Sequence, residues 1–346
     1  METLWFMIVA VMIAVYVVLD GFDLGSGFVS AFVARTPGER RAVIRAIGPY
    51  WDGNEVWLLA AGGVLFFAFP KLYASSFAGF YLPLMIVLWL LILRGIAIEF
   101  GSHVSNPLWR NFWDAGFAFA SILLTVFYGA ALGNVVRGVP LDKDGIFFLP
   151  LWTDFSTSGQ LGVLDWYTIL IGVLAAATLA LHGALWVNYR VVGSLQERTA
   201  GFARKVAIVV ILLTAVVTSI TFQVQPMAAA SLTARPWGFL FPASTLAGLA
   251  MVAVYLRRQG GQLRAFLGSC LFIAGMLTSA ANSVYPFVLP ARPNAQWGLT
   301  ISNSSTSAYG LSIALYWWAP ALALTAAYFV FLFSRFRGKI EVVEAD

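Results

Sequence analysis

The chain has very few side chains that can hold a metal ion or a haem. Its 346 residues include one cysteine, Cys270, and two histidines, His103 and His182. One cysteine cannot build a disulfide framework or a cysteine metal site. Two histidines cannot supply the axial ligands of a multi-haem site, and we expect His182 to be packed or hydrogen-bonded rather than a lone haem ligand. The sequence also lacks a glycine-rich phosphate loop and a paired-histidine metal motif.

Charge is scarce as well. Charged residues make up 11% of the chain and hydrophobic residues 60%, and the mean hydropathy is +0.82. Soluble proteins average about 25% charged residues, so the composition indicates a polytopic protein of the lipid bilayer. The net charge of +5 does not indicate a nucleic-acid partner, because the basic residues lie in short loops between apolar runs.

Runs of about 20 apolar residues predict an all-α membrane protein. We expect nine transmembrane helices, arranged as helical bundles, in a single integral membrane domain over residues 1–346. The first run is expected to be a retained helix, and Asp114 is expected to cap the fourth. The helices are predicted near residues 3–33, 52–69, 77–100, 114–134, 165–187, 205–226, 238–256, 265–289 and 309–334.

The basic residues predict an orientation. Fifteen of the 21 lysines and arginines lie in the loops after the first, third, fifth and seventh helices and in the C-terminal tail, five lie in the opposite loops, and Arg94 lies inside the third helix. Cytoplasmic loops carry the excess of lysine and arginine. We therefore expect the N-terminus outside, the C-terminus in the cytoplasm, and the long connection 135–164 outside as a folded cap.

Acids interrupt the first apolar runs, where a carboxylate costs several kcal/mol and usually serves ions, protons or substrate. Asp20 and Asp23 share a face of the first helix, Asp52 opens the second, and Glu99 lies near the end of the third. Asp52, Glu99 and Asp23 form a plausible ladder inward from the cytoplasmic surface. Arg94 lies deeper than Glu99 and requires a partner, for which Asp20 and Asp23 are the candidates.

Structural interpretations compete with this ladder. Asp20 would then be a helix–helix hydrogen-bonding group, Asp52 an N-cap of the second helix, and Glu99 an interfacial side chain that reaches the surface. Tryptophans near the same helix ends fit an aromatic belt. Gly21 and Gly25 form a small-xxx-small patch that would let another helix approach closely.

Several motifs, in order along nearly the whole chain, resemble subunit II of cytochrome bd-type quinol oxidases. The resemblance implies a nine-helix, haem-free subunit of a bacterial or archaeal cytoplasmic membrane, paired with a haem-bearing subunit I. That partner would hold haem b and haem d, oxidise quinol and reduce oxygen to water. The motifs are Leu19-Asp20-Gly21-Phe22-Asp23-Leu24-Gly25, Trp51-Asp52-Gly53-Asn54-Glu55-Val56-Trp57, Trp109-Arg110-Asn111-Phe112-Trp113-Asp114, Gly133-Asn134 with Gly138-Val139-Pro140, and Tyr285-Pro286-Phe287.

The resemblance also implies roles for individual residues. The family's cytoplasmic proton path matches Asp52, Glu99 and Asp23, with Trp51 beside it, and Asn54 would hold a bridging water. Position 99 is aspartate in some members and glutamate here. Asp20 and Arg94 remain polar groups at a helix interface.

Some features of the family stay open at this point. The connection near 227–237 is shorter than in some relatives, so neither a small single-helix accessory subunit nor a bound quinone or lipid follows from the sequence. Two other functions compete. One is an ion-coupled secondary transporter, which would show inverted repeats or helices broken at mid-membrane. The other is a purely structural partner subunit without proton transfer.

Overall fold

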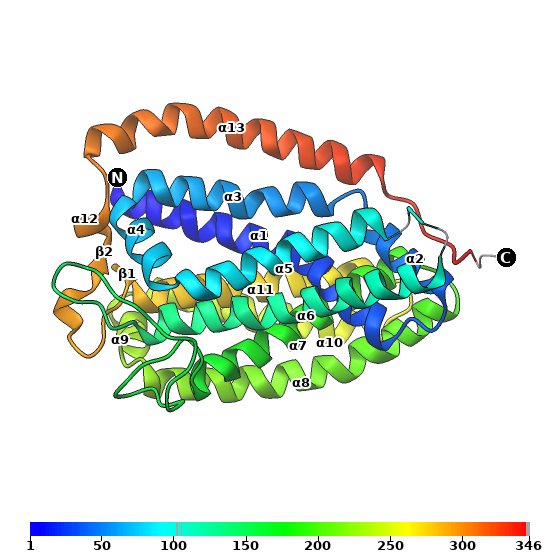
Figure 1. Cartoon of the computed structure of the whole chain (residues 1–346), viewed down its shortest axis with the longest axis horizontal. Coiled ribbons are helices and arrows are strands. Elements are labelled where there is room, and N and C mark those ends of the chain that lie inside the picture. Colours follow the sequence, from blue (N-terminus) through cyan, green and yellow to red (C-terminus); the bar gives the residue numbers. More distant parts are fainter. Residues whose placement is uncertain (102, 105, 344–346) are drawn as a thin grey trace.

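The computed structural model describes residues 1–101, 103–104 and 106–343, and long helices account for most of it (Figure 1). Within this part of the chain, eight helices are long and apolar enough to cross a membrane, and α3 with α4 (Pro70–Gly79) forms a ninth candidate, bent by 120°. The nine predicted spans are therefore confirmed. They are α1 (Glu2–Phe32), α3 (Trp51–Ala68), α5 (Tyr81–Phe100), α6 (Pro107–Arg137), α7 (Trp166–Arg190), α8 (Ser194–Val224), α10 (Leu240–Tyr255), α11 (Gln262–Val284) and α13 (Ala308–Arg335).

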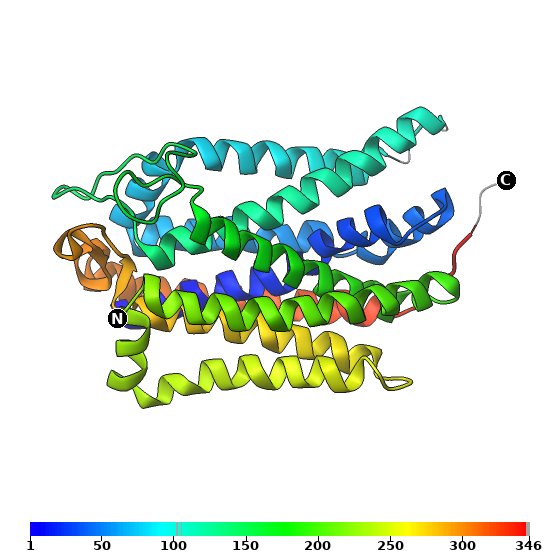
Figure 2. The same cartoon turned by 90° about the horizontal axis from the view of Figure 1, so that it is seen from below.

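The long helices run side by side, so that the structure has two ends (Figures 1 and 2). One end carries α4, α9 (Met227–Ala234), α12 (Ile301–Ser304), the 3-10 helices Pro236–Phe239 and Ala295–Trp297, and the strands β1 (Phe287–Leu289) and β2 (Leu299–Thr300). The amphipathic helix α2 (Pro37–Ile47) and the described part of the C-terminal tail lie at the other. The loops predicted to be rich in lysine and arginine share this second end, which we call the basic end.

Three predicted boundaries are wrong. The sixth predicted helix starts at Ser194 instead of residue 205, and the other two differ for local reasons. The fourth predicted helix starts at Pro107, where Asn106 accepts hydrogen bonds from the N–H groups of Leu108 and Trp109. Asp114 therefore lies inside α6, and its carboxylate pairs with Arg40 at 2.9 Å instead of capping the helix. The eighth helix ends at Val284, because the residue before a proline disfavours helical geometry, and Pro286 leads into β1, which pairs with β2.

The long connection between α6 and α7 is folded, as predicted. Val139, Leu149 and Val163 are buried in it. Asp165 accepts hydrogen bonds from the N–H groups of Tyr167 and Thr168, caps α7, and forms a buried ion pair with Arg137. A charged pair and a helix cap thus hold the connection against the end of α6.

Polar contacts also close the basic end. Arg190, at the end of α7, donates to the carbonyl of Phe336, and Ile340 in the tail exchanges backbone hydrogen bonds with residues 190 and 192. Glu39 on α2 accepts from the N–H of Arg35 and from Arg198 on α8. Burial opposes the charged form of Glu39, but these donors stabilise it, so that the pKa of its carboxyl lies below the ordinary value.

Helices α1 and α7 cross at glycines. An added Cβ on Gly25 would lie 1.9 Å from the carbonyl oxygen of Leu179, and one on Gly183 would lie 2.1 Å from the carbonyl carbon of Gly25. On Gly21 it would lie 2.8 Å from Cδ2 of Leu179. The predicted small-xxx-small patch is confirmed, and its partner is α7.

We expect Gly25→Ala to destabilise the purified complex by about 1–3 kcal/mol or more, since the added methyl must push two backbones apart. Thermal unfolding in detergent measures this. Gly201→Ala on α8 is the matched control, because a Cβ there meets nothing within 4 Å, and it should leave the unfolding temperature unchanged or slightly raised. Equal unfolding temperatures for the two variants would contradict the close crossing.

Candidate functional site

Three helices bring charged side chains together inside the bundle. Asp20 on α1 and Arg94 on α5 are both fully buried, and Nη1 of Arg94 donates to Oδ1 of Asp20 at 2.7 Å. The predicted need of Arg94 for a partner is met by Asp20, not by Asp23. The other arm of the same guanidinium, Nη2, donates at 2.9 Å to Oε2 of Glu55 on α3, a side chain that is 23% exposed. One arginine therefore neutralises two carboxylates.

Two tyrosines extend this cluster into the bundle. The Tyr16 hydroxyl donates to Oδ2 of Asp20 at 2.8 Å and lies 2.7 Å from the hydroxyl of Tyr128 on α6. Glu55, Arg94, Asp20, Tyr16 and Tyr128 thus form a continuous chain of hydrogen-bonding groups from a partly exposed carboxylate to the interior. We call these five residues the Arg94 network.

Asp23 and Asn54 form a second buried polar pair. Asn54 Nδ2 donates to Oδ2 of Asp23 at 2.8 Å and to the carbonyl of Leu19 at 3.2 Å. Oδ1 of Asp23 and Oδ1 of Asn54 are buried, and neither has a hydrogen-bond partner within the described part of the chain. These two buried oxygens are both acceptors, so they require a hydrogen-bond donor. The donor is either a proton on the Asp23 carboxyl or a water.

The remaining predicted acids lie at the surface of the chain taken alone. Asp52, in the first turn of α3, and Glu99, in the last turn of α5, are exposed. Neither makes a hydrogen bond or ion pair within the residues that the structure describes. The ring of Trp51 lies against Gly95, one turn before Glu99, since a Cβ on Gly95 would lie 3.7 Å from that ring.

The capping interpretation of Asp52 is wrong. Tyr50 is the N-cap of α3, and no side chain caps this end. Asp52 is the second helical residue, and its position three residues before Glu55 puts both on one face of the helix. An exposed carboxylate at Asp52 is thus followed, one turn deeper, by the half-buried carboxylate that binds Arg94.

Sequence reasoning missed three members of the Arg94 network: Glu55, Tyr16 and Tyr128. Glu55 stands inside a motif that was singled out, and its spacing from Asp52 was the available signal. Tyr16 lies four residues before Asp20 and so on the same helical face. Nothing in the sequence distinguishes Tyr128 from other aromatic residues of α6.

His182 is a packed histidine, as predicted. Its Nδ1 lies 2.7 Å from Oγ of Ser269 and its Nε2 lies 2.8 Å from the carbonyl of Val18. The ring stacks on Phe266 with centroids 4.9 Å apart. Both nitrogens are engaged, so that neither is free to ligate a haem iron. The described residues contain no group of three or more His, Cys, Asp or Glu side chains that could hold a metal ion.

The arrangement suits proton movement better than covalent chemistry. Carboxyl, hydroxyl and amide groups lie within hydrogen-bonding distance of one another at membrane depth, where ionisable groups mark ion or proton pathways. Two carboxylates sharing one guanidinium give the Arg94 network a formal charge of −1 when both are ionised. Such a network can accept one proton without leaving the arginine unpaired.

The chain matches known proteins over nearly its whole length. The family model for cytochrome bd terminal oxidase subunit II matches residues 1–336. A probable cytochrome oxidase subunit 2 of Haemophilus influenzae is 30% identical, with 98% of this chain and 94% of that protein aligned. Cytochrome bd-I ubiquinol oxidase subunit 2 of Escherichia coli K12 is 30% identical over 90% of this chain and 87% of its own. The corresponding Bacillus subtilis protein is 31% identical over 90% and 89%.

A solved structure has the same fold. A chain of the bd oxidase from Geobacillus thermodenitrificans superposes with a TM-score of 0.71, covering 98% of this chain and 99% of that one, at 16% sequence identity. At this identity the match concerns the fold alone. It agrees with the helical membrane architecture predicted from the sequence.

We expect Arg94→Met to cost about 3–5 kcal/mol of stability, because it leaves Asp20 buried without a counter-charge. The triple variant Asp20→Asn, Glu55→Gln, Arg94→Met removes the charges together and should recover much of the loss. Thermal unfolding of the purified complex measures both.

The control for this experiment is Arg40→Gln, which breaks the partly exposed pair with Asp114, whose side chains are 24% and 29% exposed. Exposed pairs contribute about 0–1 kcal/mol, so the control should change little. An Arg94→Met complex as stable as the Arg40→Gln complex would show that the buried ion pair is not needed for folding.

Proposed function

The chain belongs to the cytochrome bd terminal oxidase subunit II family, and on this premise we propose that it is the haem-free subunit of a quinol:oxygen oxidoreductase. Its partner, subunit I, holds haem b and haem d, oxidises quinol and reduces oxygen to water. This chain supports that partner in the cytoplasmic membrane and supplies it with protons from the cytoplasm. The family membership carries the first part of the proposal, and the buried acids carry the second.

Oxygen reduction consumes protons, and a haem buried in a low-dielectric interior cannot collect them from water without a relay. Asp52 is the entrance in this proposal, because it is exposed and unpaired in the described chain at the basic end. Glu99 shares that duty beside Trp51. Asp23 passes the proton inward with Asn54, and the two buried acceptors of this pair, Oδ1 of Asp23 and Oδ1 of Asn54, support a bridging water there.

The exposed face of α3 supports a path that ends in a partner. Asp52, Val56 and Leu59 share this face, and Val56 and Leu59 are 52% and 74% exposed. A partner that covers this face would enclose the entrance at Asp52, whereas Asp23 and Asn54 lie on the buried side of α3. An apolar pocket of about 200 Å³ between α1, α3 and α13, lined by Met7, Trp57 and Trp318 among others, has room for part of a lipid chain or quinone tail.

The alternatives make different demands on the structure. A secondary transporter would place broken helices at mid-membrane, whereas the break between α3 and α4 lies at the end of the bundle opposite the basic end (Figure 1). A purely structural subunit would tolerate neutral replacements of its unpaired acids. The second alternative is the one that an experiment must address.

We expect Asp52→Asn to leave assembly and haem content normal and to lower quinol oxidase turnover at least about tenfold, or about 1.4 kcal/mol on the limiting step. The variant keeps the size and hydrogen-bonding capacity of the side chain and removes its titratable group. Oxygen consumption of the purified complex measures it. Glu341→Gln, an exposed acid of the tail at the same end, should keep full turnover. Near-normal turnover of the Asp52→Asn complex would reject the entrance role.

The orientation is a separate prediction. In a Cys270→Ala background, cysteine at Glu2 should be labelled only from the periplasmic side of sealed vesicles, and cysteine at Glu341 only from the cytoplasmic side, on the 15-to-5 distribution of lysine and arginine. Labelling of position 341 from the periplasm would reverse the topology and remove Asp52 from the cytoplasmic side.

A further inference from the structure

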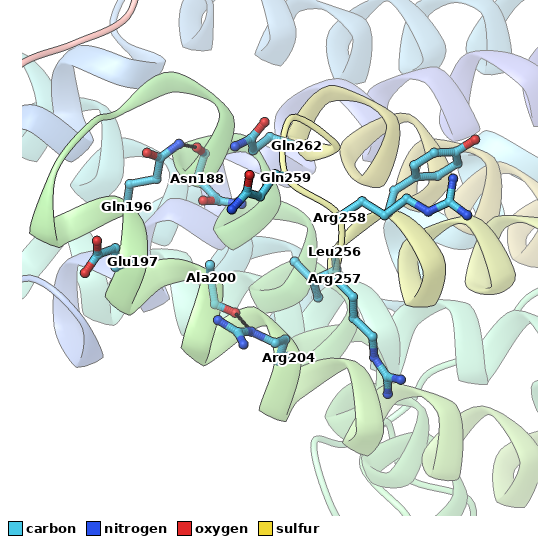
Figure 3. A pocket seen from close by; sticks show the side chains of 11 residues that line it. Asn188, Gln196, Glu197, Ala200, Arg204, Leu256, Arg257, Arg258, Gln259 and Gln262 are labelled. Atoms are coloured by element: carbon cyan, nitrogen blue, oxygen red, sulfur yellow. Dashed lines mark hydrogen bonds between the residues drawn. The ribbon is translucent and has the colours of Figure 1, made fainter.

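An open pocket at the basic end is used neither by the Arg94 network nor by the proposed proton path. It lies between the first turns of α8 and the loop that joins α10 to α11, and its volume is about 590 Å³ (Figure 3). Figure 3 shows Arg204 and Arg257 along one edge and the amides of Asn188, Gln259 and Gln262 along the other. The pocket therefore presents cations beside neutral hydrogen-bonding groups.

No carboxylate of the described chain neutralises the arginines of this pocket, although the guanidinium of Arg258 lies over the ring of Tyr255, 5.5 Å from its centroid. Three arginines and one glutamate line it, a formal charge of +2. Among the described residues, Arg204, Arg257 and Arg258 form no ion pair with a carboxylate, whereas Arg198, on the same helix as Arg204, is paired with Glu39. Within the part of the chain that the structure describes, the guanidinium of Arg204 donates only to the carbonyl of Ala200, at 3.2 Å.

Apolar surface continues from the pocket toward the middle of the bundle. Ile208 and Leu212 follow Arg204 at four-residue steps on one face of α8, and both are 62% exposed. Val254 lies about one helical turn before Arg257 and Arg258 in the sequence, and its side chain is 44% exposed. Because α8 packs mainly on α7 and α10 mainly on α11, no other described part of this chain covers these faces. The positively charged pocket thus lies at the basic end of the helices, and apolar surface continues from it along α8 and α10.

We propose that this pocket binds the phosphate headgroup of an anionic phospholipid, whose acyl chains lie on the outer face of α8. Arginine guanidiniums bind phosphate oxygens in bidentate fashion, and basic pockets between transmembrane helices suit anionic headgroups. Glu197 lies on the side away from Arg257 in Figure 3, which leaves the arginine edge for the phosphate. The proposal requires only that the helices span a bilayer, and is independent of the proton path.

The test uses the whole delipidated complex in nanodiscs or mild detergent. Phosphatidylglycerol should raise its unfolding temperature and be retained in native mass spectra, and phosphatidylcholine with the same acyl chains should do neither. Arg204→Gln with Arg257→Gln should weaken phosphatidylglycerol binding at least about tenfold. The matched control, Arg335→Gln with Arg337→Gln, removes the same charge from exposed arginines at the end of α13 and should bind as the wild type does.

Four results would overturn the proposal. Equal loss of binding in the two double variants would mean diffuse attraction to a basic surface. Equal stabilisation by phosphatidylcholine would mean that the apolar face alone binds. Stabilisation by inorganic phosphate without lipid would mean a site for a free anion. Ala200→Phe, which places a ring in the pocket and keeps every arginine, should also lower phosphatidylglycerol retention, and unchanged retention by a folded Ala200→Phe complex would place the lipid elsewhere.

Discussion

A buried guanidinium that water does not solvate needs counter-charges beside it. Most of this bundle is arranged so that Arg94 has them. Moving one charge into a low-dielectric interior costs several kcal/mol, which is offset only by well-placed partners. Asp20 and Glu55 supply them from two other helices. α1, α3 and α5 are therefore fixed in depth and rotation relative to one another, because sliding one of them by a single turn would separate a buried charge from its partner.

α1 is the element that this constraint places at the centre. One of its faces carries Asp20 and Asp23 toward α5 and α3, and its glycines allow α7 to approach until the backbones touch. The peripheral helices have looser requirements. α13 exposes Tyr316 and Trp317 by 76% and 79%, and α8 leaves a row of aliphatic side chains to lipid. Polarity decreases outward from α1, the reverse of the order in a soluble protein, because here the solvent at the sides is hydrocarbon.

The sequence was sufficient for those features that depend on one helix at a time. Length and hydropathy predicted the nine spans, and the glycine patch on α1 predicted a close crossing. Features that depend on the distance between helices were only partly accessible. Arg94 was known to need a partner, but a choice between Asp20 and Asp23 depends on how α1 is rotated. Glu55 was overlooked because a carboxylate in the first turns of a helix has many local explanations, and Asp114 was misplaced because Asn106 and Pro107 start α6 earlier.

The tail after α13 has a consequence for how the protein is made. Its backbone hydrogen bonds with residues 190 and 192, and the bonds of Tyr50 and Arg190 to the Phe336 carbonyl, join the segment that follows α13 to the loops after α1 and α7. Those loops emerge from the ribosome long before the tail does. The hydroxyl of Tyr50 and the guanidinium of Arg190 therefore lack the Phe336 carbonyl as an acceptor while the later helices are inserted. The basic end can therefore reach its full set of hydrogen bonds only after α13 has been inserted, because the shared acceptor, the Phe336 carbonyl, follows that helix.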